Sequence, residues 1–266
     1  MTDKTTENPS KVLNRCAIPK GKGYKVAIIC GDMKRFQLIR ENASQYKEFG
    51  HYLCWTAAEF EVDGELILMV CHGVGSMSSA TIIVELIELG VKCIIRSGTC
   101  GTFQPKLHGT GDICIPYAGV KGDTASQIEI SAPFPSVADP DVVEALRVAG
   151  DEENLEFHFG IAYSTDLFYR TGIRMCDIRN NYIKCGVAIE DTENTTLFTL
   201  ATIHNIRSGA ICTIDGCPFE WNLGNYSPTS EKMNEGKKTM VRVAVKAAMR
   251  LSRMIKEEEA AAAAKP

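Results

Sequence analysis

Short apolar runs recur along the chain and predict buried β-strands. Several of these runs are rich in valine and isoleucine, which is typical of strands that are covered on both faces in a parallel sheet. A weakly alternating segment ends in Asp63-Gly64, a pair that favours a tight hairpin turn into the run that follows. The predicted strands are 25–30, 52–62, 65–71, 91–95, 111–120, 157–165, 182–189 and 209–214.

Between these runs, apolar positions recur at helical spacing. Residues 76–89 show this spacing, with serines at the start that can cap the first turn and Gly90 at the end. This helix and the two strands around it form a β–α–β unit, whose crossover should be right-handed. The predicted helices are 34–46, 76–89, 139–149, 194–204 and 232–258. The chain shows no repeat and no linker, so we expect one α/β domain with a mixed central sheet flanked by helices.

Composition excludes several functional classes. A chain of 266 residues with a net charge of −4 has no electrostatic footprint for nucleic acid or for an anionic membrane. No apolar run approaches the roughly 18 residues of a membrane span, and the polar N-terminus lacks the apolar core of a signal peptide. We therefore expect a cytoplasmic protein with a domain at 24–256, a disordered N-terminal arm at 1–23 and a disordered tail at 257–266.

The cysteines and histidines do not indicate a disulfide scaffold or a metal centre. The 11 cysteines are scattered, and many lie inside predicted strands, where cysteine behaves as a small hydrophobic residue. An odd count without a secretion signal favours reduced thiols. The five histidines show no metal-ligand spacing, so we expect no bound metal.

Three predicted strands run directly into glycine-bearing segments, and two of these segments carry an arginine. Gly31 and Arg35 follow the first strand, and Arg96 follows the fourth, with Gly98 and Thr99 just beyond it. Ligands of open α/β sheets lie at the C-terminal ends of strands. Guanidinium groups and free amides at that place would bind an oxyanion. The alternative is that each segment is an ordinary glycine turn with an arginine on the surface.

Acidic and aromatic residues follow the later strands. Asp215 ends an apolar strand, where a dry pocket would raise its pKa and suit it to general acid catalysis. It could equally cap the turn at Gly216. Glu193 could accept hydrogen bonds from sugar hydroxyls or favour the start of the next helix. Phe168 could stack on a flat ring or belong to the core.

Five motifs occur in the order and spacing of a known family. GDMKR, HGVG, RSGTCG, EDTEN and TIDGCPFEW resemble those of the nucleoside phosphorylase-I family, above all its protozoan purine nucleoside and uridine phosphorylases. The resemblance implies a twisted, mixed, barrel-like sheet and a pentosyltransferase of nucleoside salvage. In such enzymes inorganic phosphate cleaves the N-glycosidic bond and yields ribose 1-phosphate and a free base. The resemblance also implies phosphate as co-substrate, no cofactor, and a homodimer or a higher oligomer such as a trimer of dimers.

The same resemblance implies a role for each candidate residue. Glu193, with Thr192 beside it, would hold the ribose hydroxyls. Asp215 would protonate N7 of a purine as the base leaves, and Phe168 would wall the base. Arg96 and Asp215 would be the catalytic residues. The phosphate ligands would be Gly31, Arg35, Arg96, Gly98 and Thr99.

The sequence departs from the family pattern at the site. Leu53 takes the place of an arginine that family members lend to the phosphate site across a dimer interface, and Thr192 replaces a methionine that packs under the sugar. For the base, Asp215 favours a purine. Arg174 instead matches the arginine with which uridine phosphorylases read uracil, but Gly172 replaces the glutamine that accompanies it. The choice between uracil and a purine stays open.

Three hypotheses about function follow. The first is a nucleoside phosphorylase. The second is a hydrolytic nucleosidase of the same superfamily, in which water replaces phosphate; Arg35 and Arg96 argue against it. The third is a catalytically weak or inactive homologue that serves as a binding subunit, and Leu53 and Thr192 are its support.

Overall fold

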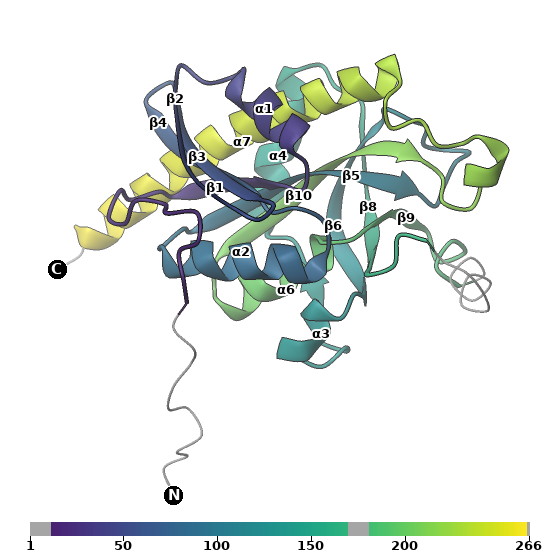
Figure 1. Ribbon diagram of the computed structural model, residues 1–266, viewed down its shortest axis with the longest axis horizontal. Coiled ribbons are helices and arrows are strands. Elements are labelled where there is room, and N and C mark those ends of the chain that lie inside the picture. The colour runs from purple at the N-terminus through teal and green to yellow at the C-terminus, as the bar shows by residue number, and fades with distance from the viewer. Residues whose placement is uncertain (1–11, 170–180, 265–266) are drawn as a thin grey trace, which may run out of the picture.

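The computed structural model describes residues 12–169 and 181–264, which form one sheet and the helices around it (Figure 1). The strands are β1 (Val26–Cys30), β2 (Gln45–Tyr52), β3 (Trp55–Val62), β4 (Glu65–Cys71), β5 (Cys93–Thr102), β6 (Ile113–Gly122), β7 (Ser136–Val137), β8 (Phe157–Thr165), β9 (Val187–Asp191) and β10 (Arg207–Gly216). The helices are α1 (Met33–Arg40), α2 (Ser76–Glu88), α3 (Ala125–Glu129), α4 (Pro140–Glu152), α6 (Asn194–Ile203), the 3₁₀ turn η2 (Trp221–Leu223) and α7 (Glu231–Ala263).

Five strands of the sheet close into a barrel. β5 pairs in parallel with β10, and the ring continues through β6, β8 and β9 back to β5. From β5 the sheet also extends outward through β1, β4, β3 and β2. A mixed, barrel-like sheet within one α/β domain is therefore confirmed, and β5 belongs to both the barrel and its extension.

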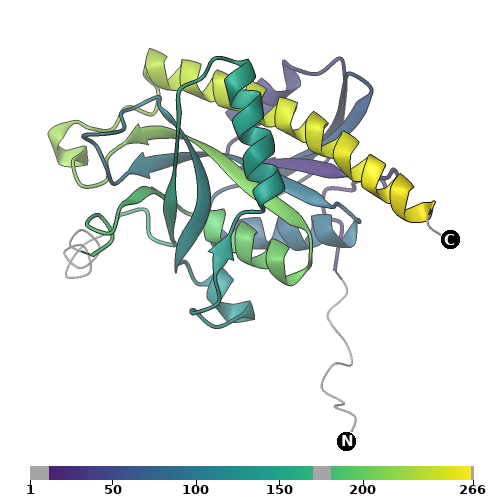
Figure 2. The same ribbon diagram turned by 180° about the vertical axis from the view of Figure 1, so that it is seen from behind.

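Helices cover both faces of the sheet at β1, which explains why this strand reads as a continuous apolar run. Along β1, Val26, Ile28 and Cys30 pack in one core with residues of α4 and α7. The alternate residues Ala27 and Ile29 pack in a second core with residues of α2 and α6. Figure 2 shows α4 crossing the long α7 on one side of the sheet, with α2 and α6 on the other.

Both ends of the chain differ from the expectation of disorder in their described parts. α7 continues to Ala263, because its alanine-rich last turns have high helix propensity. Before β1, Cys16 is buried, and the Gly50 N–H of β2 donates to its carbonyl oxygen at 2.8 Å. Arg15 pairs with Glu85 of α2. Among the described helices, none combines the length and the apolar character needed to cross a membrane.

Several elements differ from the predicted ones in length or capping, and three of these differences bear on the site or on the sheet edge. α1 ends at Arg40, and Tyr46 belongs to β2, because this segment forms an antiparallel pair with β3. β5 does not end at Ile95 but continues through the glycine-rich segment to Thr102, because β10 pairs along it. The N-cap of α2 is Gly75, and no serine side chain caps that helix.

Candidate active site

A cavity of about 260 Å³ opens where β1, β5, β9 and β10 end. It also receives side chains from the start of α1, from the segment after β10 and from α7. Such a position, at the C-terminal ends of strands, is the usual ligand site of α/β sheets. Of the residues predicted for the site, the cavity is lined by Gly31, Arg35, Arg96, Thr99, Phe168, Thr192, Glu193 and Asp215.

Gly31 and Arg35 form one wall of the cavity. A Cβ on Gly31 would lie 2.7 Å from the carbonyl oxygen of Gly73, so only glycine fits where these two turns approach each other. The Arg35 side chain is buried, and its Nη1 donates to the carbonyl oxygen of Ser97 at 3.1 Å. Its Nε lies 3.9 Å from the carboxylate of Asp32. Arg35 is thus held beside β5 with a distant carboxylate as its counter-charge.

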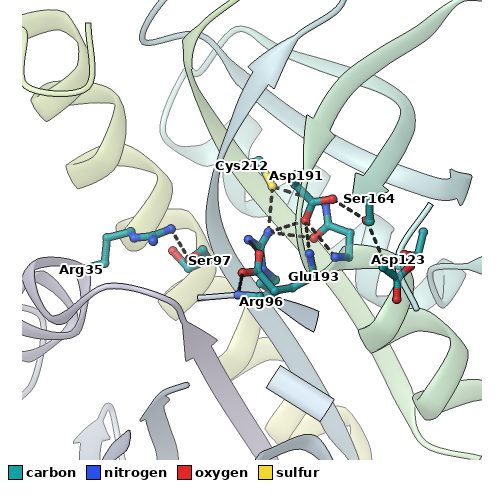
Figure 3. Close-up of polar contacts among 11 residues, drawn as sticks. Arg35, Arg96, Ser97, Asp123, Ser164, Asp191, Glu193 and Cys212 are labelled. Carbon is teal, nitrogen blue, oxygen red and sulfur yellow. Dashed lines mark hydrogen bonds and ion pairs between the residues drawn. The ribbon is translucent and has the colours of Figure 1, made fainter. Parts of the chain in front are cut away.

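Arg96 projects from β5 into a cluster of polar side chains (Figure 3). Its Nη1 lies 3.1 Å from the Asp191 carboxylate and donates to Asn194 Oδ1 at 2.9 Å, while its Nη2 pairs with Glu193. A Cβ on Gly98 would overlap Arg96 Nη1. Gly98 therefore makes room for the guanidinium; it does not itself line the cavity, and its contact with phosphate stays a prediction.

Three buried donors at this wall lack a hydrogen-bond partner among the described residues. They are Arg35 Nε, Arg96 Nε and Ser97 Oγ. Ser97 lies between the two arginines in Figure 3. A buried donor left unpaired costs about 1–3 kcal/mol, and such groups in native proteins usually serve a ligand or an ordered water. Of the three residues, the two arginines line the cavity, so an oxyanion that enters it can accept the hydrogen bonds that their Nε groups do not make within the chain.

Two buried carboxylates beside Arg96 differ in pKa. Burial alone would raise the pKa of Glu193, but the Arg96 guanidinium outweighs it and lowers the pKa to about 2. Glu193 also accepts a hydrogen bond from the Gly75 N–H at 2.8 Å. Burial raises the pKa of Asp191, which accepts from Ser164 Oγ at 2.6 Å and from two N–H groups at the start of α6. Glu193 stays ionised, as an acceptor for hydroxyl groups must be, and Asp191 holds it in place.

Asp215 follows Ile214 near the end of β10 and faces the same cavity. Burial raises its pKa to about 7, although Lys237 and Arg35 act in the opposite direction. A carboxyl with a pKa near the working pH can hold a proton and give it up, which is the property of a general acid. A cap on the Gly216 turn would not need this environment.

Aromatic side chains form the outer wall of the cavity. The Phe168 ring lies 4.9 Å from that of Trp221 between centroids, at an interplanar angle of 32°. Trp221 in turn lies 4.9 Å from Tyr226. All three residues line the cavity. Flat aromatic surfaces of this kind can stack on a planar heterocycle.

Comparison with known proteins shows the family to which this chain belongs. The family model for the phosphorylase superfamily matches residues 25–256. This chain belongs to the phosphorylase superfamily. It is 34% identical to the purine nucleoside phosphorylase of Plasmodium falciparum over 215 residues, which cover 81% of this chain and 87% of that protein.

Two further superfamily members extend the comparison. The crystal structure of purine nucleoside phosphorylase from Toxoplasma gondii in complex with immucillin-H superimposes with a TM-score of 0.87 at 31% identity, covering 93% of this chain and 99% of that one. The uridine phosphorylase of Salmonella typhimurium is 27% identical over 241 residues, which cover 86% of this chain and 93% of that protein. Relatives of this phosphorylase-superfamily chain thus include proteins named for purines and for uridine.

The positions at which the chain departs from the family pattern do not all belong to the cavity. Leu53 is 72% exposed in the turn between β2 and β3 and does not line the cavity. His51, two residues before Leu53, could be considered as a replacement for the missing arginine, but its Nδ1 lies 2.7 Å from Thr56 Oγ1 and it does not line the cavity. Thr192 does line the cavity. Arg174, the predicted reader of uracil, lies outside the described residues.

Sequence reasoning missed several residues of the phosphorylase cavity, among them Trp221, Tyr226 and Lys237. Trp221 and Tyr226 come from the irregular segment after β10, which has no periodicity to place its side chains. The DGCPFEW motif contains Trp221, so the motif itself was the available signal. Lys237 comes from the second turn of α7 and reaches the cavity only because that helix packs against α1 and the barrel. Nothing in the local sequence marks it.

Proposed function

We propose that this chain is a nucleoside phosphorylase that acts on purine nucleosides and releases the free base and ribose 1-phosphate. The observation that supports this most is the placement of Asp215, with a pKa of about 7, in the same cavity as Arg35 and Arg96. Each arginine keeps a buried Nε without a hydrogen-bond partner among the described residues. One cavity thereby offers an acid for the leaving base and donors for the attacking anion, which is the combination that phosphorolysis requires.

In the proposed reaction, phosphate lies against Arg35 and Arg96 and the nucleoside lies between Glu193 and the aromatic wall. As the bond between C1′ of the ribose and N9 of the purine lengthens, its electron pair passes into the base. Asp215 gives its proton to N7, which neutralises the base as it leaves. A phosphate oxygen forms the new bond to C1′. The ionised Glu193 accepts hydrogen bonds from the ribose hydroxyls and favours the positive charge that develops on the sugar ring.

A purine is the better-supported base. The Plasmodium falciparum and Toxoplasma gondii relatives, at 34% and 31% identity, are named purine nucleoside phosphorylases, whereas the uridine phosphorylase of Salmonella typhimurium is at 27%. A proton donor such as Asp215 serves a purine through N7, and uracil has no such atom. Gly172 also lacks the glutamine side-chain amide with which the uridine enzymes are expected to read uracil.

We also propose that the enzyme is a cytoplasmic homodimer, or a higher oligomer built from dimers, with phosphate as co-substrate and no resident cofactor. Val74 lines the cavity, yet 75% of it is exposed, and Met77 one turn away is 79% exposed. Leu53 adds a third large apolar side chain that nothing within the described chain covers. A second copy of the chain would cover such residues and enclose the mouth of the cavity.

The test is base release from inosine, adenosine and uridine, measured with and without inorganic phosphate. A purine nucleoside phosphorylase releases hypoxanthine only when phosphate is present and forms ribose 1-phosphate in equal amount. Release of base and free ribose without phosphate would mean a hydrolytic nucleosidase. No release from any nucleoside would favour a binding subunit without catalysis, and phosphate-dependent release from uridine alone would overturn the choice of a purine.

A further inference from the structure

The cavity contains a cation that the reaction described above does not use. Lys237 lines it from the second turn of α7, and its side chain is half-buried. Its Nζ donates one hydrogen bond, to the carbonyl oxygen of Pro228 at 2.7 Å. In the part of the chain that the structure describes, no carboxylate lies within 4.0 Å of this ammonium group. A lysine ammonium has three donors, so Lys237 keeps two of them for another partner.

The charged groups that face Lys237 do not neutralise it. They are Arg35, Asp32, Asp215 and Lys34, and among them Arg35 has the strongest effect. Burial, followed by the repulsion from Arg35, lowers the pKa of Lys237. Asp32 is already shared with Arg35, and burial keeps a proton on Asp215 up to about pH 7. Two cations that face one cavity repel each other, and a bound anion would relieve that repulsion.

The anion site needs such a charge. Arg96 is flanked by the carboxylates of Glu193 and Asp191, so its positive charge is largely compensated within the chain. Leu53, at the position where an arginine is expected, carries no charge at all. Without Lys237, Arg35 would be the main source of attraction for a phosphate dianion in this cavity.

We infer that Lys237 binds phosphate in the catalytic cavity, where it stands beside Arg35 and supplies the charge that Leu53 does not. The inference rests on the proposed function for the identity of the anion. The hydrogen bond from Lys237 to the carbonyl oxygen of Pro228 also ties α7 to the segment that carries Trp221 and Tyr226. The same side chain thereby connects the phosphate subsite with the aromatic wall.

The experiment compares Lys237→Gln and Lys237→Arg with the wild-type enzyme. Gln keeps an N–H donor for Pro228 but removes the charge, whereas Arg keeps the charge. Lys238→Gln is the matched control, because Lys238 is the next residue, is exposed and pairs with Glu235 at 2.7 Å. Lys237→Met, which keeps the aliphatic stem, replaces the Gln variant if thermal unfolding shows that Gln disturbs the fold.

Two measurements are made on each protein: phosphate affinity by titration calorimetry, and KM for phosphate and for inosine at constant pH. Loss of a charge-assisted contact predicts an increase of about tenfold or more in the phosphate Kd and KM of Lys237→Gln. The inosine KM should change much less, Lys237→Arg should recover most of the affinity, and Lys238→Gln should match the wild type.

The results separate this inference from the proposed function. Phosphate affinity that is equal in Lys237→Gln and the wild type would overturn the inference, even if the enzyme is a phosphorylase. A variant in which only the pH dependence of kcat moves would also overturn it, because Lys237 would then act on Asp215. Phosphate binding that depends on Lys237 in a protein without phosphorolysis would support the anion site and refute the proposed function.

Discussion

Replacement of Asp215 tests the chemistry of the site most directly. Asp215→Asn keeps the size of the side chain and a hydrogen-bond donor, but the amide cannot give up a proton. Positioned acid catalysis contributes a factor of about 10²–10⁴, so kcat for inosine should fall by that factor. Cleavage of uridine, if there is any, should fall much less, because uracil can leave as an anion stabilised through its carbonyl oxygens.

The raised pKa of Asp215 adds a pH signature. In the wild type the protonated fraction falls as the pH rises through about 7, so kcat/KM for inosine should decline on the alkaline side. The variant has no titrating acid at this place and should lose that limb of the profile. Phosphate titrates in the same range, so the comparison is made at saturating phosphate and between variant and wild type.

Asp215→Asn should lower the activity but raise the stability of the protein at alkaline pH. The pKa of Asp215 rises from 3.8 to about 7 on folding, so the folded state binds this proton more tightly than the unfolded chain. Stability is therefore lost as the pH rises between these two values, by up to about 4 kcal/mol at 1.36 kcal/mol per unit. Asp215→Asn removes this penalty, so the variant should unfold at a higher temperature than the wild type at pH 8. At pH 4 the two proteins should be similar.

The assays are inosine phosphorolysis between pH 5 and 9 and thermal unfolding at pH 4 and 8 (about the range in which carboxyl and phosphate groups titrate). Equal losses of activity on inosine and uridine would contradict the reasoning and indicate an aspartate that caps the Gly216 turn. An alkaline limb that survives in Asp215→Asn would assign that limb to another group. A variant that is less stable at pH 8 would show that the carboxylate makes favourable contacts there.

Three further outcomes are expected. Arg96→Ala should raise the phosphate KM by about tenfold or more and, since it leaves Glu193 and Asp191 without their counter-ion, lower the free energy of unfolding by about 3–5 kcal/mol; unchanged phosphate dependence would contradict the placement of Arg96. Gly98→Ala should displace the Arg96 guanidinium, because its Cβ would overlap Nη1, and kinetics in which the variant matches the wild type would show that the guanidinium has room elsewhere. Sedimentation of the protein at micromolar concentration should give at least a dimer, and Met77→Asp should weaken it; a wild-type monomer would refute the proposed assembly.

The strands of the fold could be predicted because two helical layers bury them. β4 and β8 begin and end at the predicted residues, and the runs that became β1 and β10 were found to within a few residues. β2 was missed, because its residues QYKEFGHY are largely polar and lie on an exposed edge, where no apolar alternation is required. The helical expectation for Tyr46 failed for the same reason: pairing with β3 decides the conformation there.

The site could be predicted only in part. Arg35, Arg96, Glu193 and Asp215 were found because each follows a predicted strand, and parallel strands bring such positions together. The pairing of Arg96 with two carboxylates could not be foreseen, since β5 and β9 meet only through the closure of the barrel. Lys237 was invisible for a similar reason: its position depends on how α7 packs and not on any pattern in its own helix.

The two halves of the cavity rest on different kinds of structure: the anion-binding residues on the paired strand β5, and the aromatic wall on connecting segments. Hydrogen bonds to β1, β9 and β10 fix the backbone of β5, and with it the positions of Arg96 and Ser97. The opposite wall, with Phe168 and Trp221, stands on connecting segments outside the sheet. Connecting segments accept insertion and substitution far more readily than paired strands do. Proteins with this fold can therefore change their base specificity by changes in the connecting segments, while the anion-binding residues on β5 stay the same.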